Sequence, residues 1–171
     1  MSTEQVFRGW DKGLEYKEQK KRLEKLLDET GLFWIAIYLI QLENGSRIGE
    51  AVNCYLAWCK NGKQEQLITV EKRKDKMQRR MIIPKPVHIR SWPADLLTCY
   101  KDPIDVAATY CTRLLGYNSH ALRHCRLSYW LFVKKYPAPT VAKSVGMKSI
   151  GTLMNYMQEV QADAMLREAI E

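Results

Sequence analysis

Residues 32–43 read LFWIAIYLIQLE, a stretch that is apolar on almost every side of a helix. A helix that is hydrophobic all round belongs in the interior of a domain. Gly31 precedes the stretch and Asn44-Gly45 follows it, so turn residues bound it at both ends. We therefore expect a central helix around which the rest of the chain packs.

An amphipathic helix is predicted on each side of this central segment. Residues 14–29, LEYKEQKKRLEKLLDE, place their leucines on one stripe among charged side chains. After the glycine turn, Arg47 opens a further helix that runs to about Trp58. The N-terminal third of the chain is therefore predicted to be helical throughout.

The next segment carries the signals of β-strands. Asn61-Gly62 is a turn signal, and a β-rich run, QLITVEK (66–72), follows it. A highly basic tip separates this run from RMIIP (80–84), which would be the returning strand, and Pro84 ends it. The predicted fold class is mainly α with one small antiparallel β-hairpin, which is an α+β architecture.

The C-terminal half is predicted to be helical again. Pro93 and Pro103 each suit the first turn of a helix, and Gly116 suits the end of the second of these helices. Another helix is expected over about 120–135, and two or three shorter helices after it close the chain.

Composition and charge indicate which kind of molecule the protein binds. The 171 residues include 27 Lys and Arg against 19 Asp and Glu, which gives a formal charge of +8 and a pI near 9.3. This excess favours a polyanionic partner, either nucleic acid or an anionic membrane surface. The longest apolar run, 31–42, is about half as long as a membrane span. We therefore expect a soluble, cytoplasmic protein that does not enter a membrane.

The five cysteines have no C-x-x-C spacing, so neither a zinc site nor a disulfide framework can be read from them. They are expected to be reduced and mostly buried thiols. No metal and no cofactor is predicted for this chain.

Several polar features carry residue types that suit phosphate chemistry. Arg47 lies at a predicted helix start, and Glu50, three residues on, can orient its guanidinium from the same face. The hairpin tip is rich in lysine. His120 and Arg123 are also three residues apart and share one predicted helix face, and Tyr156 follows a short helical segment near the end.

In this order along the chain, the features resemble those of the tyrosine recombinases, also called phage integrases, which are related to the type IB topoisomerases. GSRIGE (45–50) is similar to the segment around the family's first catalytic arginine, and HALRH (120–124) to its most recognisable motif. VAKSVGMKSIGTLMNY (141–156) is similar to the run that ends in the nucleophilic tyrosine. The resemblance covers roughly residues 15–160 and implies the tyrosine recombinase catalytic-domain fold.

The resemblance also implies a role for each motif residue in metal-independent cleavage and rejoining of DNA. Arg47 and Arg123 would hold the phosphate, because a guanidinium stays charged and binds two oxygens at once. His120 would hydrogen-bond the phosphate or help to move the proton of the tyrosine. Tyr156 would attack the phosphorus and form a 3′-phosphotyrosyl intermediate, which stores the bond energy for religation.

In this family a lysine at the hairpin tip protonates the leaving 5′ oxygen. Pairing Val70 with Ile82 in the predicted hairpin centres its turn on Lys76. The lysine that flanks this turn is Lys74, which we predict to be the catalytic lysine. The other basic side chains predicted to contact DNA phosphates are Lys72, Lys76, Arg79 and Lys148.

One position departs from the family pattern. Many members have a histidine, or some a tryptophan, nine residues before the tyrosine, whereas this chain has Met147. Methionine cannot donate a useful hydrogen bond. Either Lys148 turns in to replace the donor, or the site is one donor short, a loss that costs about 10²–10³ in rate in other enzymes.

We expect residues 1–14 to form an N-terminal tail and residues 15–171 to form a single catalytic domain that ends in a helix. An N-terminal core-binding domain, with which full recombinases clamp DNA, is expected to be absent. The predicted partner is double-stranded DNA. A homo-oligomer, a tetramer in this family, is expected on DNA, and a monomer in its absence.

Three other interpretations stay open on the sequence alone. Residues 140–159 also fit a helix-turn-helix with Gly146 in the turn, which would suit a non-catalytic DNA-binding regulator. A degenerate relative that binds DNA without turnover is a second interpretation, to which Met147 points. A topoisomerase-like activity, which nicks and closes DNA without strand exchange, is the third. Covalent trapping on nicked DNA and relaxation of supercoiled plasmid would separate them.

Overall fold

Helix α2 (Phe33–Asn44) is the centre of the fold in the computed structural model, which describes residues 13–92, 97–154 and 166–169. Every side chain over 34–42 is buried, because this stretch has no polar face to turn to solvent. Gly45 ends the helix, and its amide donates to the carbonyl oxygens at the end of α2. The predicted central helix is confirmed.

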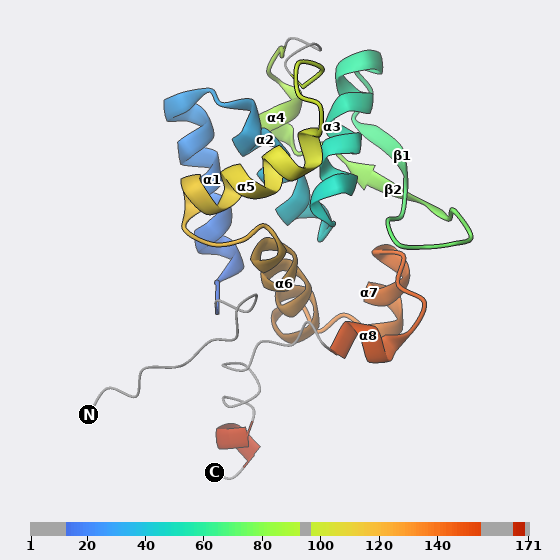
Figure 1. Cartoon of the computed structure of the whole chain (residues 1–171). Helices are drawn as coiled ribbons and strands as arrows, with labels where there is room; N and C mark the ends of the chain where they lie inside the picture. The colour runs from blue at the N-terminus through green and yellow to red at the C-terminus, as the bar shows by residue number, and fades with distance from the viewer. Residues whose placement is uncertain (1–12, 93–96, 155–165, 170–171) are drawn as a thin grey trace.

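Four other helices pack against α2. They are α1 (Tyr16–Thr30), α3 (Ile48–Asn61), α5 (Pro103–Leu115) and α6 (His120–Ser128). Figure 1 shows α1 and α3 on opposite sides of α2. Leu23 and Leu27 of α1 are fully buried, as the amphipathic pattern predicts, and the predicted helices around α2 are confirmed with slightly different ends.

The hairpin consists of β1 (Glu65–Thr69) and β2 (Gln78–Ile82), which pair antiparallel. The described residues are thus mostly helical with one small two-stranded sheet, and the predicted α+β class is confirmed. The predicted strand register is wrong: Ile82 pairs with Glu65 and not with Val70. The side chain of Asn44 fixes the actual register, since it bonds both the amide (2.8 Å) and the carbonyl oxygen (2.8 Å) of Ile82.

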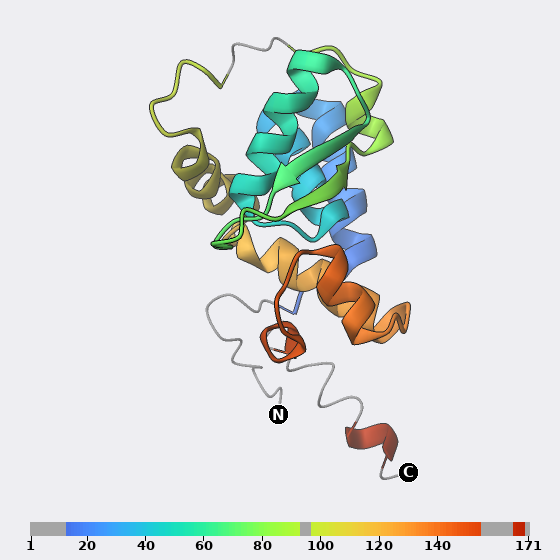
Figure 2. The ribbon, with the colours of Figure 1, turned by 90° about the vertical axis from the view of Figure 1, so that its right-hand side faces the viewer.

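This register makes residues 70–77 the tip of the hairpin. The tip closes where the amide of Val70 donates to the carbonyl of Met77 at 2.8 Å. Lys72 and Lys76 both take left-handed backbone conformations, with φ of 61° and 50°. Lys74 therefore lies close to the centre of the tip and not beside a turn centred on Lys76. Figure 2 shows the hairpin from its outer side, with α3 beside it.

The chain after the hairpin follows the helical prediction with two additions. A short helix that the sequence analysis does not predict, α4 (Lys85–His88), follows Pro84. The predicted helix over 120–135 is α6 continued by a π-helical segment, η2 (Tyr129–Val133). Pro93 lies outside the described residues.

Two short helices, α7 (Ala138–Ser144) and α8 (Ile150–Met154), complete the described fold. Residues 166–169 are helical, and the rest of the predicted C-terminal helix lies outside the described residues. In the part of the chain that the structure describes, no helix is both long and apolar enough to cross a membrane.

Candidate functional site

Arg47 lies at the N-cap of α3, where the sequence places it. Its Nη1 donates to the carbonyl oxygen of Glu71 at 3.0 Å and lies 3.4 Å from Oε1 of Glu50. The side chain is 19% exposed, so the guanidinium is held by protein groups and still reaches solvent. The predicted pairing of Arg47 with Glu50 is present.

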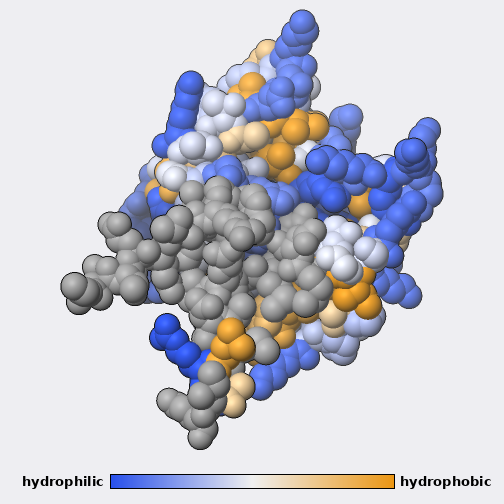
Figure 3. Space-filling model, turned by 60° about the horizontal axis from the view of Figure 1, so that its bottom comes forward, coloured by the Kyte–Doolittle hydropathy of each residue, from blue (hydrophilic) through white to orange (hydrophobic). Residues whose placement is uncertain are grey.

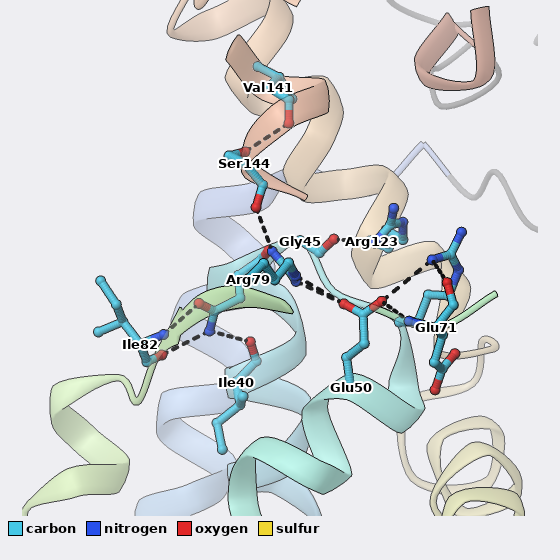
Figure 4. A network of polar contacts seen from close by, with 11 residues as sticks. Ile40, Gly45, Glu50, Glu71, Arg79, Ile82, Arg123, Val141 and Ser144 are labelled. Carbon is cyan, nitrogen blue, oxygen red and sulfur yellow. Dashed lines mark hydrogen bonds and ion pairs between the residues drawn. The ribbon is translucent and has the colours of Figure 1, made fainter. Parts of the chain in front are cut away.

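Glu50 is a completely buried carboxylate at the centre of this network (Figure 4). Its Oε2 accepts from Nε of Arg79 at 3.1 Å, and its Oε1 accepts from the amide of Glu71 at 3.3 Å. Two guanidinium groups, from Arg47 and Arg79, compensate its charge. Buried carboxylates need such partners, because desolvation of an unpaired charge is costly.

Arg79 is 6% exposed, although it is predicted to contact DNA. Besides Glu50, its Nη1 donates to the carbonyl oxygens of Asn44 (3.2 Å) and Ser144 (3.0 Å). The alternation of β2 turns Arg79 inward, since the register sets which face each side chain takes. This position argues against the predicted phosphate contact, and we assign Arg79 to the internal ion-pair network.

Arg123, on α6, is the largest fully buried side chain of the described residues. Its Nη1 donates to the carbonyl oxygen of Gly45 at 2.7 Å, as Figure 4 shows. Gly45 lies two residues before Arg47, so both predicted catalytic arginines meet at the loop between α2 and α3. The structure therefore brings Arg47 and Arg123 together from distant parts of the sequence.

His120 begins α6, one turn before Arg123. Burial first, and then the positive charges of Arg123, Arg47 and Lys72, together lower the pKa of His120 to about 4. Since such charge effects fall with distance, these three cations lie close enough to act on the imidazole. The ring of His124 lies edge-on at 5.2 Å, so it supports His120 from the same helix. His120 is neutral at pH 7.

Glu71, at the start of the hairpin tip, is affected by the same three positive charges. Burial and the nearby carboxylate of Glu50 raise the pKa of Glu71, while the charges of Arg47, Lys72 and Arg123 oppose the rise. Four side chains from α3, the hairpin tip and α6 thus form one group, which we call the Arg–His–Lys cluster: Arg47, Lys72, His120 and Arg123.

The tip lysines differ in their relation to this cluster. The charge of Lys72 acts on both His120 and Glu71. All three lysines, Lys72, Lys74 and Lys76, are exposed, and Lys74 lies near the centre of the tip. Of the lysines in the described tip, Lys72 therefore has the clearest connection to His120, whereas the sequence prediction is Lys74.

The residues before the predicted nucleophile are described up to α8. Met147 is half-buried, and its amide donates to the carbonyl of Ala142 at 2.8 Å. Lys148 is exposed and lies near the hairpin tip, where its charge, after the hydrogen bond from Arg73, helps to lower the pKa of Asp75. Tyr156 lies outside the described residues, two positions after the end of α8.

Sequence reasoning missed three residues of this region, Glu71, Arg73 and Asp75. The one signal available is that Asp75 is an acid within a run of basic residues, which indicates a local ion pair. Within the described ranges, no group of three or more His, Cys, Asp or Glu side chains could hold a metal ion. The Arg–His–Lys cluster offers fixed cations and a neutral imidazole. Such groups can bind the oxygens of a phosphodiester and neutralise its charge.

Comparison with known proteins finds viral and archaeal relatives. The chain is 31% identical, over 93% of its length and 68% of the relative, to a protein of Acidianus two-tailed virus named "Putative integrase ORF241". It is 28% identical to "Putative integrase V10" of Sputnik virophage, over 93% of this chain and 89% of that one. An uncharacterized protein of Methanocaldococcus jannaschii is 29% identical, over 92% and 87% of the two chains. No family model and no solved structure matches the chain.

Proposed function

The chain belongs to the integrase-like family of the Acidianus two-tailed virus protein, and we propose that it is a tyrosine recombinase that cleaves and rejoins DNA strands. The reaction would be site-specific recombination through a 3′-phosphotyrosyl intermediate. Two relatives that are 31% and 28% identical to this chain are named putative integrases, which supports an integrase-like role. The chemical mechanism rests on the side chains of this chain.

One observation carries the proposal: Arg47 and Arg123 converge on the loop between α2 and α3, with His120 beside them. Two arginines fixed by backbone carbonyls are preorganised for the charge of a pentacoordinate phosphate. Glu50 pairs with Nη1 of Arg47, and the Arg47 side chain stays 19% exposed. A surface salt bridge alone would not require this convergence of residues 76 positions apart.

The proposed step begins with attack of the Tyr156 oxygen on the phosphorus. The bond from phosphorus to the 5′ oxygen breaks as the bond to tyrosine forms, so the number of phosphate esters is unchanged. His120 is neutral at pH 7, because its pKa is about 4, so one ring nitrogen is free to accept the phenolic proton. The negative charge of the bound phosphate would offset the neighbouring cations and make the imidazole a stronger base. A lysine gives a proton to the leaving 5′ oxygen. Religation runs these steps in reverse on another strand.

The lysine of this step comes from the hairpin tip. Lys74 is the sequence-based candidate, but that choice depends on a register that the structure does not have. The charge of Lys72 acts on His120, which favours Lys72 as the proton donor. We therefore propose Lys72, with Lys74 as the alternative.

Double-stranded DNA is the proposed substrate, and assembly on it as a tetramer is part of the same proposal. The formal charge of +8 and the exposed lysines of the tip support it. Figure 3 shows hydrophilic side chains projecting widely around one face of the molecule. Because phosphate contacts release counterions, binding should weaken steeply as salt rises from ~50 to 200 mM. The proposed phosphate contacts are Lys74, Lys76 and Lys148.

The proposal is tested with a nicked suicide substrate, from which the short 5′-hydroxyl fragment dissociates after cleavage and prevents religation. The native protein should form a covalent protein–DNA adduct that survives denaturation, and Tyr156→Phe should form none. DNA binding without any adduct would support a non-catalytic regulator instead. Relaxation of supercoiled plasmid without strand exchange would support a topoisomerase-like enzyme.

A further inference from the structure

Helices α7 and α8 pack around a hydrophobic cluster of their own, separate from the main core. Its buried members are Leu127, Val141, Ala142, Val145 and Leu153. Leu127 belongs to α6, so this cluster attaches the two helices to α6 on one side. We call 138–154 the α7–α8 unit. Its position relative to the Arg–His–Lys cluster depends on what holds its other side.

The hairpin provides this second attachment. Nη1 of Arg73 donates to the carbonyl oxygen of Gly146 at 3.0 Å. Gly146 also packs tightly on Val70: a Cβ at Gly146 would lie 2.6 Å from a methyl carbon of Val70, and its φ of 70° independently favours glycine. Deeper in the structure, Nη1 of Arg79 bonds the carbonyl oxygen of Ser144, the last residue of α7.

Asp75 holds Arg73 in the orientation that this contact needs. Nε of Arg73 donates to Oδ1 of Asp75 at 2.9 Å, and Nη2 donates to Oδ2. This two-point pairing leaves Nη1 directed at Gly146. Ser144 ends α7, and Gly146 follows two residues later. The last carbonyl oxygens of a helix lack intrahelical donors, so guanidinium groups at this end of α7 are favourable. At 17% exposure, the Arg73 side chain is partly shielded from solvent.

We propose that Arg73 is a positioning residue that holds the α7–α8 unit, which precedes Tyr156 in the sequence, against the hairpin tip; we call this contact the latch. The catalytic part of this inference rests on the proposed function. The hairpin tip would then act on both the phosphate and the helices that precede the nucleophile. Lys72, next to Arg73, acts on the phosphate site, while Arg73 holds the helices that lead to the nucleophile. A displacement of about 1 Å between reacting groups costs about 10²-fold in rate.

The test compares Arg73→Gln with a matched control, Arg80→Gln. Arg80 is on β2 of the same hairpin, and its 67% exposed side chain pairs with Glu65 and not with the α7–α8 unit. Each variant loses one positive charge, so a general weakening of DNA binding affects both. Backbone amide exchange without DNA is measured over 145–154, together with the rate of covalent adduct formation at saturating nicked DNA.

We expect faster amide exchange over 145–154 in Arg73→Gln and unchanged exchange in Arg80→Gln. The rate of adduct formation should fall about 10²-fold in Arg73→Gln, with Arg80→Gln close to native. Asp75→Asn should give smaller changes of the same kind, because Arg73 keeps its donors but loses its orientation.

Unchanged exchange in Arg73→Gln would overturn the latch, whatever happens to the rate, because a slower rate would then reflect contact with DNA. Faster exchange with a native adduct rate would overturn the positioning role. If the native protein forms no adduct, the proposed function and the catalytic part of the inference both fail. The exchange measurement needs no catalysis and would still decide the latch.

Discussion

Nη2 of Arg79 lies 3.0 Å from Oε2 of Glu50, and the two side chains are 5% and 0% exposed. The same carboxylate holds Arg47, and Arg79 reaches on to the end of α7. The proposed phosphate-binding arginine and the helices that lead to Tyr156 are therefore connected through one buried ion pair. The alignment of the site and the stability of the fold depend on the same residues.

Replacing Glu50 by Gln should destabilise the protein by about 3 kcal/mol, because it leaves two guanidinium groups without their carboxylate. Urea unfolding followed by circular dichroism measures this loss. Glu65→Gln is the control, since Glu65 and Arg80 form an exposed pair (59% and 67%) whose loss costs less than about 1 kcal/mol. A loss at Glu50 no larger than that at Glu65 would contradict the central role of this carboxylate.

Arg123→Lys should keep the charge and lose the planar fork. We expect adduct formation at saturating nicked DNA to slow by about 10²–10³, as for loss of a transition-state donor. Arg113→Lys, on the exposed surface of α5, should leave the rate unchanged. Retention of a near-native rate by Arg123→Lys, with its folding intact, would remove Arg123 from the phosphate site.

The assignment of the proton donor is tested by the leaving group. Lys72→Ala should slow cleavage of ordinary nicked DNA, and replacement of the leaving 5′ oxygen by sulfur should restore the rate, because a thiolate leaves without a proton. Lys74→Ala should change DNA affinity more than the cleavage rate. Rescue by sulfur in Lys74→Ala, and not in Lys72→Ala, would return the role to Lys74.

The lowered pKa of His120 predicts a specific pH dependence of stability. The unfolded chain protonates His120 below about 6.5 and the folded chain only below about 4. Protonation therefore favours the unfolded chain, and His120 contributes a loss of stability as pH falls from 6.5 to 4. We expect a contribution of about 2 kcal/mol after solvent screening.

Urea unfolding of the native protein and of His120→Gln at pH 7.5 and pH 4.5 measures this contribution. Carboxylates titrate in the same range in both proteins, so the difference between the two proteins isolates His120. Native protein should lose more stability on acidification than the variant. An equal loss in both would show that His120 is not held neutral by its surroundings.

The local features of the fold were predictable because they depend on residues close in sequence. The all-round apolar helix α2 has one stable location, the interior. The spacing of Arg47 and Glu50, and of His120 and Arg123, puts each pair on one helix face whatever surrounds it. The meeting of Arg47 and Arg123 at Gly45 depends on tertiary packing. From the sequence, only the resemblance to tyrosine recombinases indicated that these two arginines lie together.

The hairpin could not be predicted in detail, because its register depends on contacts from elsewhere. Asn44, more than 30 residues away, bonds Ile82, and Glu50 draws Arg79 inward. An arginine in a basic run reads as a surface residue from sequence. Only the buried carboxylate of Glu50 makes the burial of Arg79 favourable. The actual register also places Lys72 in the tip, from which its charge acts on His120.

The role of Tyr156 as the nucleophile is tested by identifying the residue that becomes attached to DNA. The adduct trapped on nicked DNA is digested with a protease and a nuclease, and the modified peptide is sequenced by mass spectrometry. A 3′-phosphonucleotide on Tyr156, absent from the Tyr156→Phe variant, is the predicted result. Attachment at any other residue, or no adduct from native protein that binds the same DNA, would show that Tyr156 is not the nucleophile.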